Sequence, residues 1–377
     1  MLGRVFLLGL ASTCLAANWL YGAVTHPYNK DPEKCGNTVE FFQLDSETGL
    51  FADSRWTLTV DPCPNRIRFY RDKYAIVLNS NDHAVNESSY SVTILRRASL
   101  VNSATPYEFV SRTTLDSEPF DVAFIEPTAG HPQAVVTVFD QAPLGGLHFI
   151  SLDSSAETAF LPLPLAASLA LVPNEDGTTV GASRLLVLSN ASLCVVAAPG
   201  GQQPSLESTW DLFADMVDCS VLGMHPTGRY AVVPNSSPFS SLGNTVSAVG
   251  ITRMPSGPLQ LKMLNRISAN ISDPFGAVYG PDPSALLLTQ CEKGRLAILR
   301  SNERTGHIAP GPEVAGSYPL VGRPAMVRGP GLVVVGALSA VHSLRMQGDR
   351  VEALAKAATA PGTEGVIGDV AIEMQDA

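Results

Sequence analysis

Charged side chains recur along this chain at one kind of position, just before or at the start of short apolar segments. There are eight such residues, of which six carry carboxylates. A ring of carboxylates can bind a cation or polarise a water molecule for hydrolysis. A structural role is the commoner explanation, because Asp before Pro starts turns and short polar side chains satisfy backbone groups at strand ends. The eight residues are Asp61, Arg66, Glu118, Asp121, Asp218, Asp273, Arg323 and Asp369.

The sequence lacks the other familiar catalytic patterns. No two histidines have metal-ligand spacing, and there is no Gly-x-Ser-x-Gly elbow. His131 and His225 each precede a proline, where a role in a turn is the simpler interpretation. Gly329-Pro330-Gly331 is not followed by a helical pattern, so these glycines indicate a turn rather than a phosphate loop. We therefore expect no metal and no cofactor.

A repeated pattern would bring the charged positions together. An X-Pro pair is followed by an alternating segment, a turn, a very apolar segment, a polar loop and a third segment. Pro62 and Pro119 are 57 residues apart, and the next 155 residues, up to Pro274, hold three further steps. From Pro274 to Pro324 the spacing is 50 residues. A period of about 50 residues with several short strands is typical of β-propeller blades.

Six complete units follow this pattern. The innermost strands are predicted at 67–70, 121–125, 169–172, 219–224, 275–279 and 325–328. The second strands, apolar enough to be packed on both faces, are predicted at 74–78, 134–139, 185–188, 230–233, 285–289 and 332–336. The third strands are predicted at 90–95, 146–152, 192–197, 245–251, 295–300 and 340–345.

The two chain ends supply a seventh unit. Segment 366–374 has the pattern of an innermost strand, and 38–44 has that of a third strand. Joining both in one blade closes the ring and removes free sheet edges. We predict an all-β, seven-bladed β-propeller, with six or eight blades as the alternatives. Segment 350–358 is either a short helix or an outer strand.

The first 16 residues resemble an export signal. Arg4 is followed by an apolar run that is too short to span a bilayer, and small residues precede Ala17. We therefore predict a signal peptide at 1–16, a linker at 17–37 and the propeller at 38–377, in a secreted or periplasmic protein without a transmembrane segment. One alternative is a lipoprotein anchored through Cys14, and another is a buried N-terminal strand.

Cysteine usage agrees with export. Cys35 and Cys63 lie near the N-terminal edge beside turn-forming residues, so an exported chain could bridge them. Cys194 and Cys291 lie in apolar runs and are expected to be plain core residues. The net charge of −10 and the lack of a basic stripe argue against nucleic acid as a partner.

One unit resembles a known family. Met224-His225-Pro226-Thr227-Gly228-Arg229-Tyr230, continuing through Val233, and Gly243-Asn244-Thr245-Val246 resemble blades of the lactonase-like seven-bladed propellers, which include the YVTN-repeat proteins. The other units match more loosely, and these motifs are structural. The resemblance implies a propeller fold; family members include sugar-lactone hydrolases and exported proteins without a known reaction.

Two functions follow for the channel face that the eight charged residues would surround. The first is a binding or protein-interaction scaffold for an unknown protein or small-molecule ligand, because long loops such as 79–89 and 235–243 suit recognition. The alternative is a lactonase-like hydrolase acting on a small lactone or ester. We favour the first, because no catalytic constellation is present in the sequence.

Overall fold

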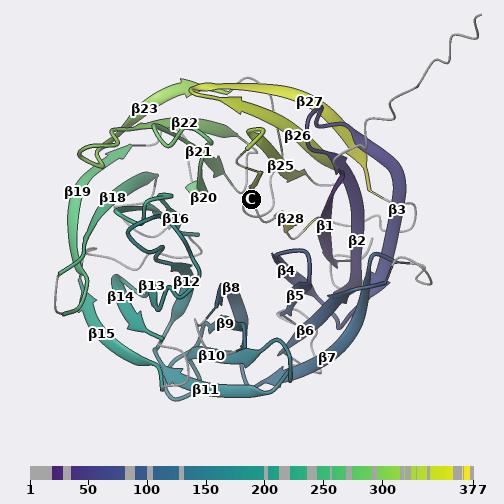
Figure 1. Cartoon of the computed structure of the whole chain (residues 1–377), viewed down its shortest axis with the longest axis horizontal. Coiled ribbons are helices and arrows are strands. Elements are labelled where there is room, and N and C mark those ends of the chain that lie inside the picture. Colours follow the sequence, from purple (N-terminus) through teal and green to yellow (C-terminus); the bar gives the residue numbers. More distant parts are fainter. Residues whose placement is uncertain are drawn as a thin grey trace, which may run out of the picture.

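The chain folds into a ring of seven sheets, each with four antiparallel strands (Figure 1). This computed structural model describes residues 19–28, 35–80, 90–99, 105–126, 131–198, 203–211, 221–235, 244–254, 257–268, 274–290, 295–314, 318, 324–327, 329–337, 340–359, 367 and 369–373. The predicted seven-bladed β-propeller is therefore confirmed. No helix in these ranges is long and apolar enough to cross a membrane. The predicted signal peptide and Cys14 lie outside them.

The blades are named here in chain order, with strands given from the channel outward. Blade 1 contains β4 (Pro64–Tyr70), β5 (Tyr74–Asn79), β6 (Tyr90–Arg97) and β7 (Tyr107–Leu115). Blade 2 contains β8 (Pro119–Ile125), β9 (Gln133–Val138), β10 (Gly146–Ser151) and β11 (Glu157–Pro162). Blade 3 contains β12 (Ala166–Leu171), β13 (Arg184–Ser189), β14 (Ser192–Ala197) and β15 (Ser205–Trp210).

The remaining blades complete the ring. Blade 4 contains β16 (Gly223–Met224), β17 (Tyr230–Asn235), β18 (Thr245–Thr252) and β19 (Gln260–Ser268). Blade 5 contains β20 (Pro274–Tyr279), β21 (Ala285–Gln290), β22 (Leu296–Ser301) and β23 (Ile308–Glu313). Blade 6 contains β24 (Ala325–Val327), β25 (Leu332–Ala337), β26 (Ala340–Gln347) and β27 (Arg350–Ala358). The closing blade contains β28 (Val370–Ile372), β1 (Trp19–Tyr28), β2 (Cys35–Asp45) and β3 (Phe51–Thr59).

The core consists of seven apolar clusters, one between each pair of neighbouring blades. The second strands supply much of it, since β5, β9 and β13 are buried at every position after the first. These strands face a neighbouring blade on both sides, which explains their nearly continuous apolar sequence. The predicted second and third strands are confirmed, and segment 350–358 is the outermost strand β27.

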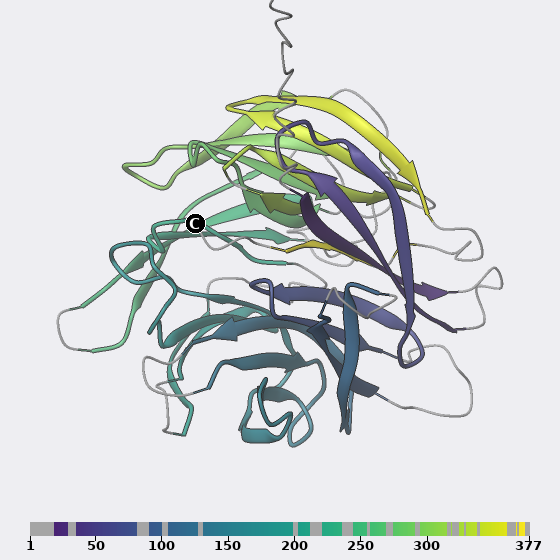
Figure 2. The ribbon, with the colours of Figure 1, turned by 45° about the vertical axis from the view of Figure 1, so that its right-hand side comes forward.

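The closing blade corrects one sequence expectation. The predicted linker at 17–37 contains β1, which lies between β28 and β2 in the sheet. With β28 as the innermost strand and β2 as the third, the blade needs a second strand between them, and β1 is that strand. Figure 2 shows the short yellow strand β28 beside the purple N-terminal strands. Both chain ends therefore share one blade, as predicted.

A disulfide ties the closing blade to blade 1. Cys35, at the start of β2, is bonded to Cys63 in the turn before β4, as the sequence predicted. The backbone supports the same connection, because the Cys63 N–H donates to the Gly36 carbonyl at 2.7 Å. Cys194 is a free thiol in the core, and burial raises its pKa. Cys291 lies outside the described residues.

Glu373, just after β28, forms a second link to blade 1. Its carboxylate is buried and accepts hydrogen bonds from Arg97 Nη1 at 2.5 Å and from the Tyr107 hydroxyl at 2.9 Å. Arg97 also stacks over the Tyr21 ring of β1. Burial, and then the charge of Glu373, raise the pKa of Tyr107, so its hydroxyl stays a donor. Opposite charges thus hold the C-terminal strand against its neighbours.

Replacing Glu373 with alanine should lower the free energy of unfolding by about 2 kcal/mol, because Arg97 and Tyr107 would lose a charged hydrogen-bond acceptor. Urea unfolding followed by tryptophan fluorescence measures the loss. Glu352→Ala, at an exposed position of β27, is the matched control and should stay within about 0.5 kcal/mol of the wild type. Equal losses in the two variants would contradict a role for Glu373 in closing the ring.

Removing the disulfide with the double variant Cys35→Ala, Cys63→Ala should lower the free energy of unfolding by about 3 kcal/mol, because the bond restrains the unfolded chain. Reducing the wild-type protein with dithiothreitol should produce the same loss. A wild-type urea midpoint that is insensitive to reductant would contradict the prediction.

Candidate functional site

Four of the innermost strands share one irregularity that aligns their side chains. In blades 1, 2, 3 and 5 the pairing with the second strand shifts near the start of the strand. Because the shift falls at the same place, the residues that follow it occupy equivalent positions around the channel. These residues are Arg66, Asp121, Ser168 and Gly276.

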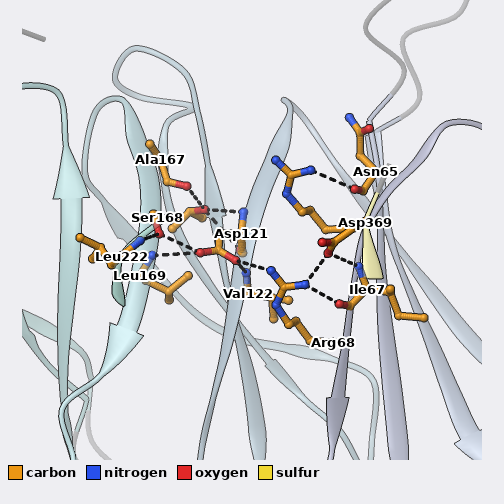
Figure 3. Close-up of polar contacts among 12 residues, drawn as sticks. Asn65, Ile67, Arg68, Asp121, Val122, Ala167, Ser168, Leu169, Leu222 and Asp369 are labelled. Atoms are coloured by element: carbon orange, nitrogen blue, oxygen red, sulfur yellow. Dashed lines mark hydrogen bonds and ion pairs between the residues drawn. The ribbon is translucent and has the colours of Figure 1, made fainter. Parts of the chain in front are cut away.

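A chain of polar contacts, called the polar belt here, runs through two of these positions, Asp121 and Ser168 (Figure 3). Asp121 Oδ1 accepts the Val122 N–H at 2.9 Å, and Oδ2 accepts the Leu169 N–H at 3.4 Å. Ser168 Oγ donates to Asp121 Oδ2 at 2.9 Å and accepts the Leu222 N–H at 3.1 Å. The belt therefore joins the innermost segments of blades 2, 3 and 4.

Arg68 extends the polar belt to blade 1 and the closing blade. Its Nη1 donates to Asp369 Oδ2, and its Nη2 lies 3.8 Å from Asp121 Oδ1. Asp369 Oδ2 also accepts the Ile67 N–H at 3.1 Å. Burial lowers the pKa of Arg68, but the charges of Asp369 and Asp121 outweigh burial and raise it overall. Both carboxylates are fully buried, so this pairing keeps their charge in the interior.

Arg66 has a different environment, although it shares the register position of Asp121. Its guanidinium carbon lies 5.5 Å from the ring centres of both Phe120 and Phe275. Phe275 belongs to β20, which is not adjacent to β4 in the ring (Figure 1). Arg66 therefore reaches into the channel between two aromatic rings, at the end where the innermost strands begin.

The other predicted site residues do not join this group. Asp61 pairs with Arg112 at 2.6 Å and accepts a hydrogen bond from Ser91. Glu118 accepts one from the Ser80 hydroxyl at 2.6 Å. Asp218, Asp273 and Arg323 lie outside the described residues. Of the predicted residues, the structure thus brings Asp121 and Asp369 together, through Arg68.

Sequence reasoning missed Arg68 and Ser168. Neither precedes a proline or starts a strand, and Ser168 lies in an apolar stretch, Ala-Ala-Ser-Leu-Ala-Leu. The available signal was the register, because Ser168 falls 47 residues after Asp121, close to one repeat. The turn role expected of His225 is confirmed: the ring is buried, and Nδ1 lies 2.8 Å from the Thr227 hydroxyl.

A cavity of about 850 Å³ lies beside the polar belt, toward the ends of the innermost strands. This volume falls within the range of small-molecule sites. Its position differs from the predicted ring, which lies where those strands begin. It is lined by Arg68, residues 69–71, 122–124, Glu126, 169–171, 177–180, 222–224 and 277–279. Within the described ranges, no three His, Cys, Asp or Glu side chains are grouped so as to hold a metal ion.

Comparison with known proteins supports the fold. No protein-family model matches the sequence, and a search of curated proteins finds no match. Solved structures do match along nearly the whole chain. The chain has the fold of the lactonase-like propellers. A Pseudomonas aeruginosa periplasmic gluconolactonase is 14% identical with a TM-score of 0.68, over 95% of this chain and 100% of that one.

Two further structures have the same fold. A candidate 6-phosphogluconolactonase from Bacteroides uniformis is 13% identical with a TM-score of 0.68, covering 94% of this chain and 99% of its own. A protein of unknown function from Desulfotomaculum acetoxidans is 14% identical with a TM-score of 0.66, over the same shares. At these identities the likeness concerns the fold alone.

Replacing Ser168 with alanine tests the polar belt. The variant should lose about 1 to 3 kcal/mol of stability, because the buried Leu222 N–H would have no acceptor. Thermal and urea unfolding measure the change. Ser205→Ala, at an exposed position on the outermost strand of the same blade, is the control and should change little. Matching unfolding curves for the two variants would show that the Ser168 hydroxyl is dispensable.

Proposed function

We propose that this protein is an exported β-propeller that binds a ligand in its channel and does not hydrolyse it. One observation carries the proposal: both oxygens of Asp121 are engaged by strand N–H groups and by Ser168. A general base needs an oxygen that can take a proton from an attacking water molecule. Asp121 is instead surrounded by donors that link three blades, so its carboxylate serves the fold.

The cavity beside the polar belt supports a binding role. Ligand sites are usually concave and mostly apolar, with a few fixed polar groups. This cavity has both features, since apolar side chains from five blades line it together with Arg68, Arg71 and Glu126. A rigid ring of sheets holds those walls in place, which favours recognition of a preformed shape.

The disulfide supports a location outside the cytoplasm. Disulfides persist in oxidising compartments such as the periplasm or the cell exterior. The Cys35–Cys63 bond agrees with the export signal predicted at 1–16, and secretion or a periplasmic location fits both features.

A lactone hydrolase is the second candidate, and the fold favours it because the Pseudomonas aeruginosa structure is a periplasmic gluconolactonase. On this alternative, Glu118 would be the base. It lies just before β8, at the end where the innermost strands begin, and is only half-buried.

Lactone hydrolysis separates the two functions. Proton release from glucono-lactone, followed with a pH indicator at fixed buffer strength, should proceed at the rate of buffer alone, because Asp121 and Asp369 are already occupied by donors of the protein. The Glu118→Gln variant should behave identically. Saturable acceleration by the wild-type protein that is lost in Glu118→Gln would overturn the binding proposal in favour of the hydrolase.

A further inference from the structure

A groove on blade 4, called the basic groove here, gathers cations from three segments. It has a volume of about 540 Å³ and lies at the end of the propeller where the innermost strands finish, beside a loop of blade 3. Arg229 precedes β17, Arg253 follows β18 and Lys262 belongs to β19, and all three line the groove. Among the described residues, Glu175 of the blade 3 loop is the one carboxylate in the lining. The lining therefore has two positive charges in excess.

These three cations differ from other arginines at the same end of the propeller, which are paired with carboxylates. The paired arginines are Arg96, Arg184 and Arg300, whose partners Glu108, Glu207 and Asp349 lie at 2.6 to 2.8 Å. In the part of the chain that the structure describes, the cations of the basic groove form no such pair. Cations that converge without a counter-charge repel one another, and an anion placed between them would remove this repulsion.

A ligand can reach these cations from solvent. Arg229 and Lys262 are exposed, and Arg253 is half-buried. A single exposed cation attracts an anion only weakly, because water screens the charge. A concave surface lined by charges of one sign concentrates their field, so three cations in one groove attract a multiply charged anion more strongly.

Contacts with the neighbouring blades hold the shape of the basic groove. Gly228 has a φ of +65°, and a Cβ at this position would lie 3.0 Å from the Pro173 carbonyl oxygen, so the blade 3 loop lies directly against this turn. Arg253 Nη2 donates to the same carbonyl. On the side of blade 5, the Tyr230 hydroxyl donates to the Arg304 carbonyl at 2.9 Å. A framework that is already in place lowers the cost of ordering groups when a ligand binds.

The volume and the charge of the basic groove indicate the class of ligand. About 540 Å³ lies within the range of small-molecule sites. Guanidinium groups form paired hydrogen bonds with phosphate and carboxylate oxygens alike. Glu175 offsets one cation, whereas the adjacent Asp176 accepts the N–H of Thr178 at 2.9 Å and its hydroxyl at 2.7 Å. The remaining excess of two charges matches an anion that carries at least two.

We propose that the basic groove binds a small molecule with two or more negative charges, carried by phosphate or carboxylate groups. The groove is separate from the cavity beside the polar belt, and the blade 3 loop contributes to both, with Glu175 in the groove and residues 177–180 in the cavity. The proposal therefore adds a second site to the channel binding inferred above and does not depend on it.

Isothermal titration calorimetry with inorganic pyrophosphate and with succinate tests the proposal. At least one of them should bind at a single site, and the tighter one identifies phosphate or carboxylate as the preferred group. Acetate, with one charge, should bind about tenfold more weakly than the tighter probe or less. Raising the salt concentration from about 0.01 M to about 0.1 M should weaken binding about tenfold, because added ions screen the charges.

Two lysine variants provide a matched comparison. Lys262→Gln removes one cation of the basic groove and should weaken binding of the tighter probe about tenfold. Lys73→Gln is the control, because Lys73 is an exposed lysine at the same end of the propeller, in blade 1, and its loss changes the net charge equally. This control should bind within about twofold of the wild type. Arg229→Gln should behave like Lys262→Gln.

Four results would overturn the proposal: no binding of either probe, acetate binding as tightly as both, binding at several equivalent sites, or equal losses in Lys262→Gln and Lys73→Gln. The three substituted side chains are exposed, so the variants should fold, and circular dichroism checks this. The probe comparison and the salt dependence use the wild-type protein, so they decide the question even if a variant does not fold.

Discussion

The fold depends on hydrogen bonds that side-chain acceptors form with backbone N–H groups of the innermost strands. In each sheet the innermost strand has one paired edge and one edge toward the channel, where buried N–H groups need partners. The polar belt supplies them across blade boundaries: Asp369 accepts from Ile67, Asp121 from Leu169, and Ser168 from Leu222. Each acceptor precedes its donor around the ring, so neighbouring blades are joined at one level. The apolar clusters supply the bulk of the burial between blades, and these bonds fix their alignment.

The need for these acceptors explains the role of two of the acidic residues, Asp121 and Asp369. A sequence with carboxylates at the starts of strands predicts a ring that could bind a cation or activate water. In the fold, Asp121 and Asp369 are fully buried and share one guanidinium, Arg68. Neutralising two buried carboxylates with a single cation is stable only because backbone and hydroxyl donors add to it. The structural interpretation of these two residues, raised from the sequence, is the one their contacts support.

The periodicity of the sequence made the architecture predictable, but it did not predict individual side-chain contacts. The X-Pro spacing and the apolar second strands predicted the number of blades and most strand positions. The same reasoning missed β1, because its sequence was treated as a linker between the export signal and the first recognised strand. It also missed Arg68, since the pairing of a long side chain with residues 53 and 301 positions away follows from ring closure and not from any local pattern.

The polar belt and the cavity are two results of the same register. The shift near the start of β8 and of β12 sets Asp121 and Ser168 at one level and, two residues later, Ala123 and Ala170 at the next. In blade 1 this second level holds Arg68, which must extend into the channel to reach Asp121 and Asp369. Its counterparts in blades 2, 3 and 4 are alanine or glycine, whereas blade 5 has Val278, and the small residues leave space beside Arg68. The register that stabilises the ring therefore also leaves a half-open cavity beside the polar belt, lined by both apolar and polar side chains.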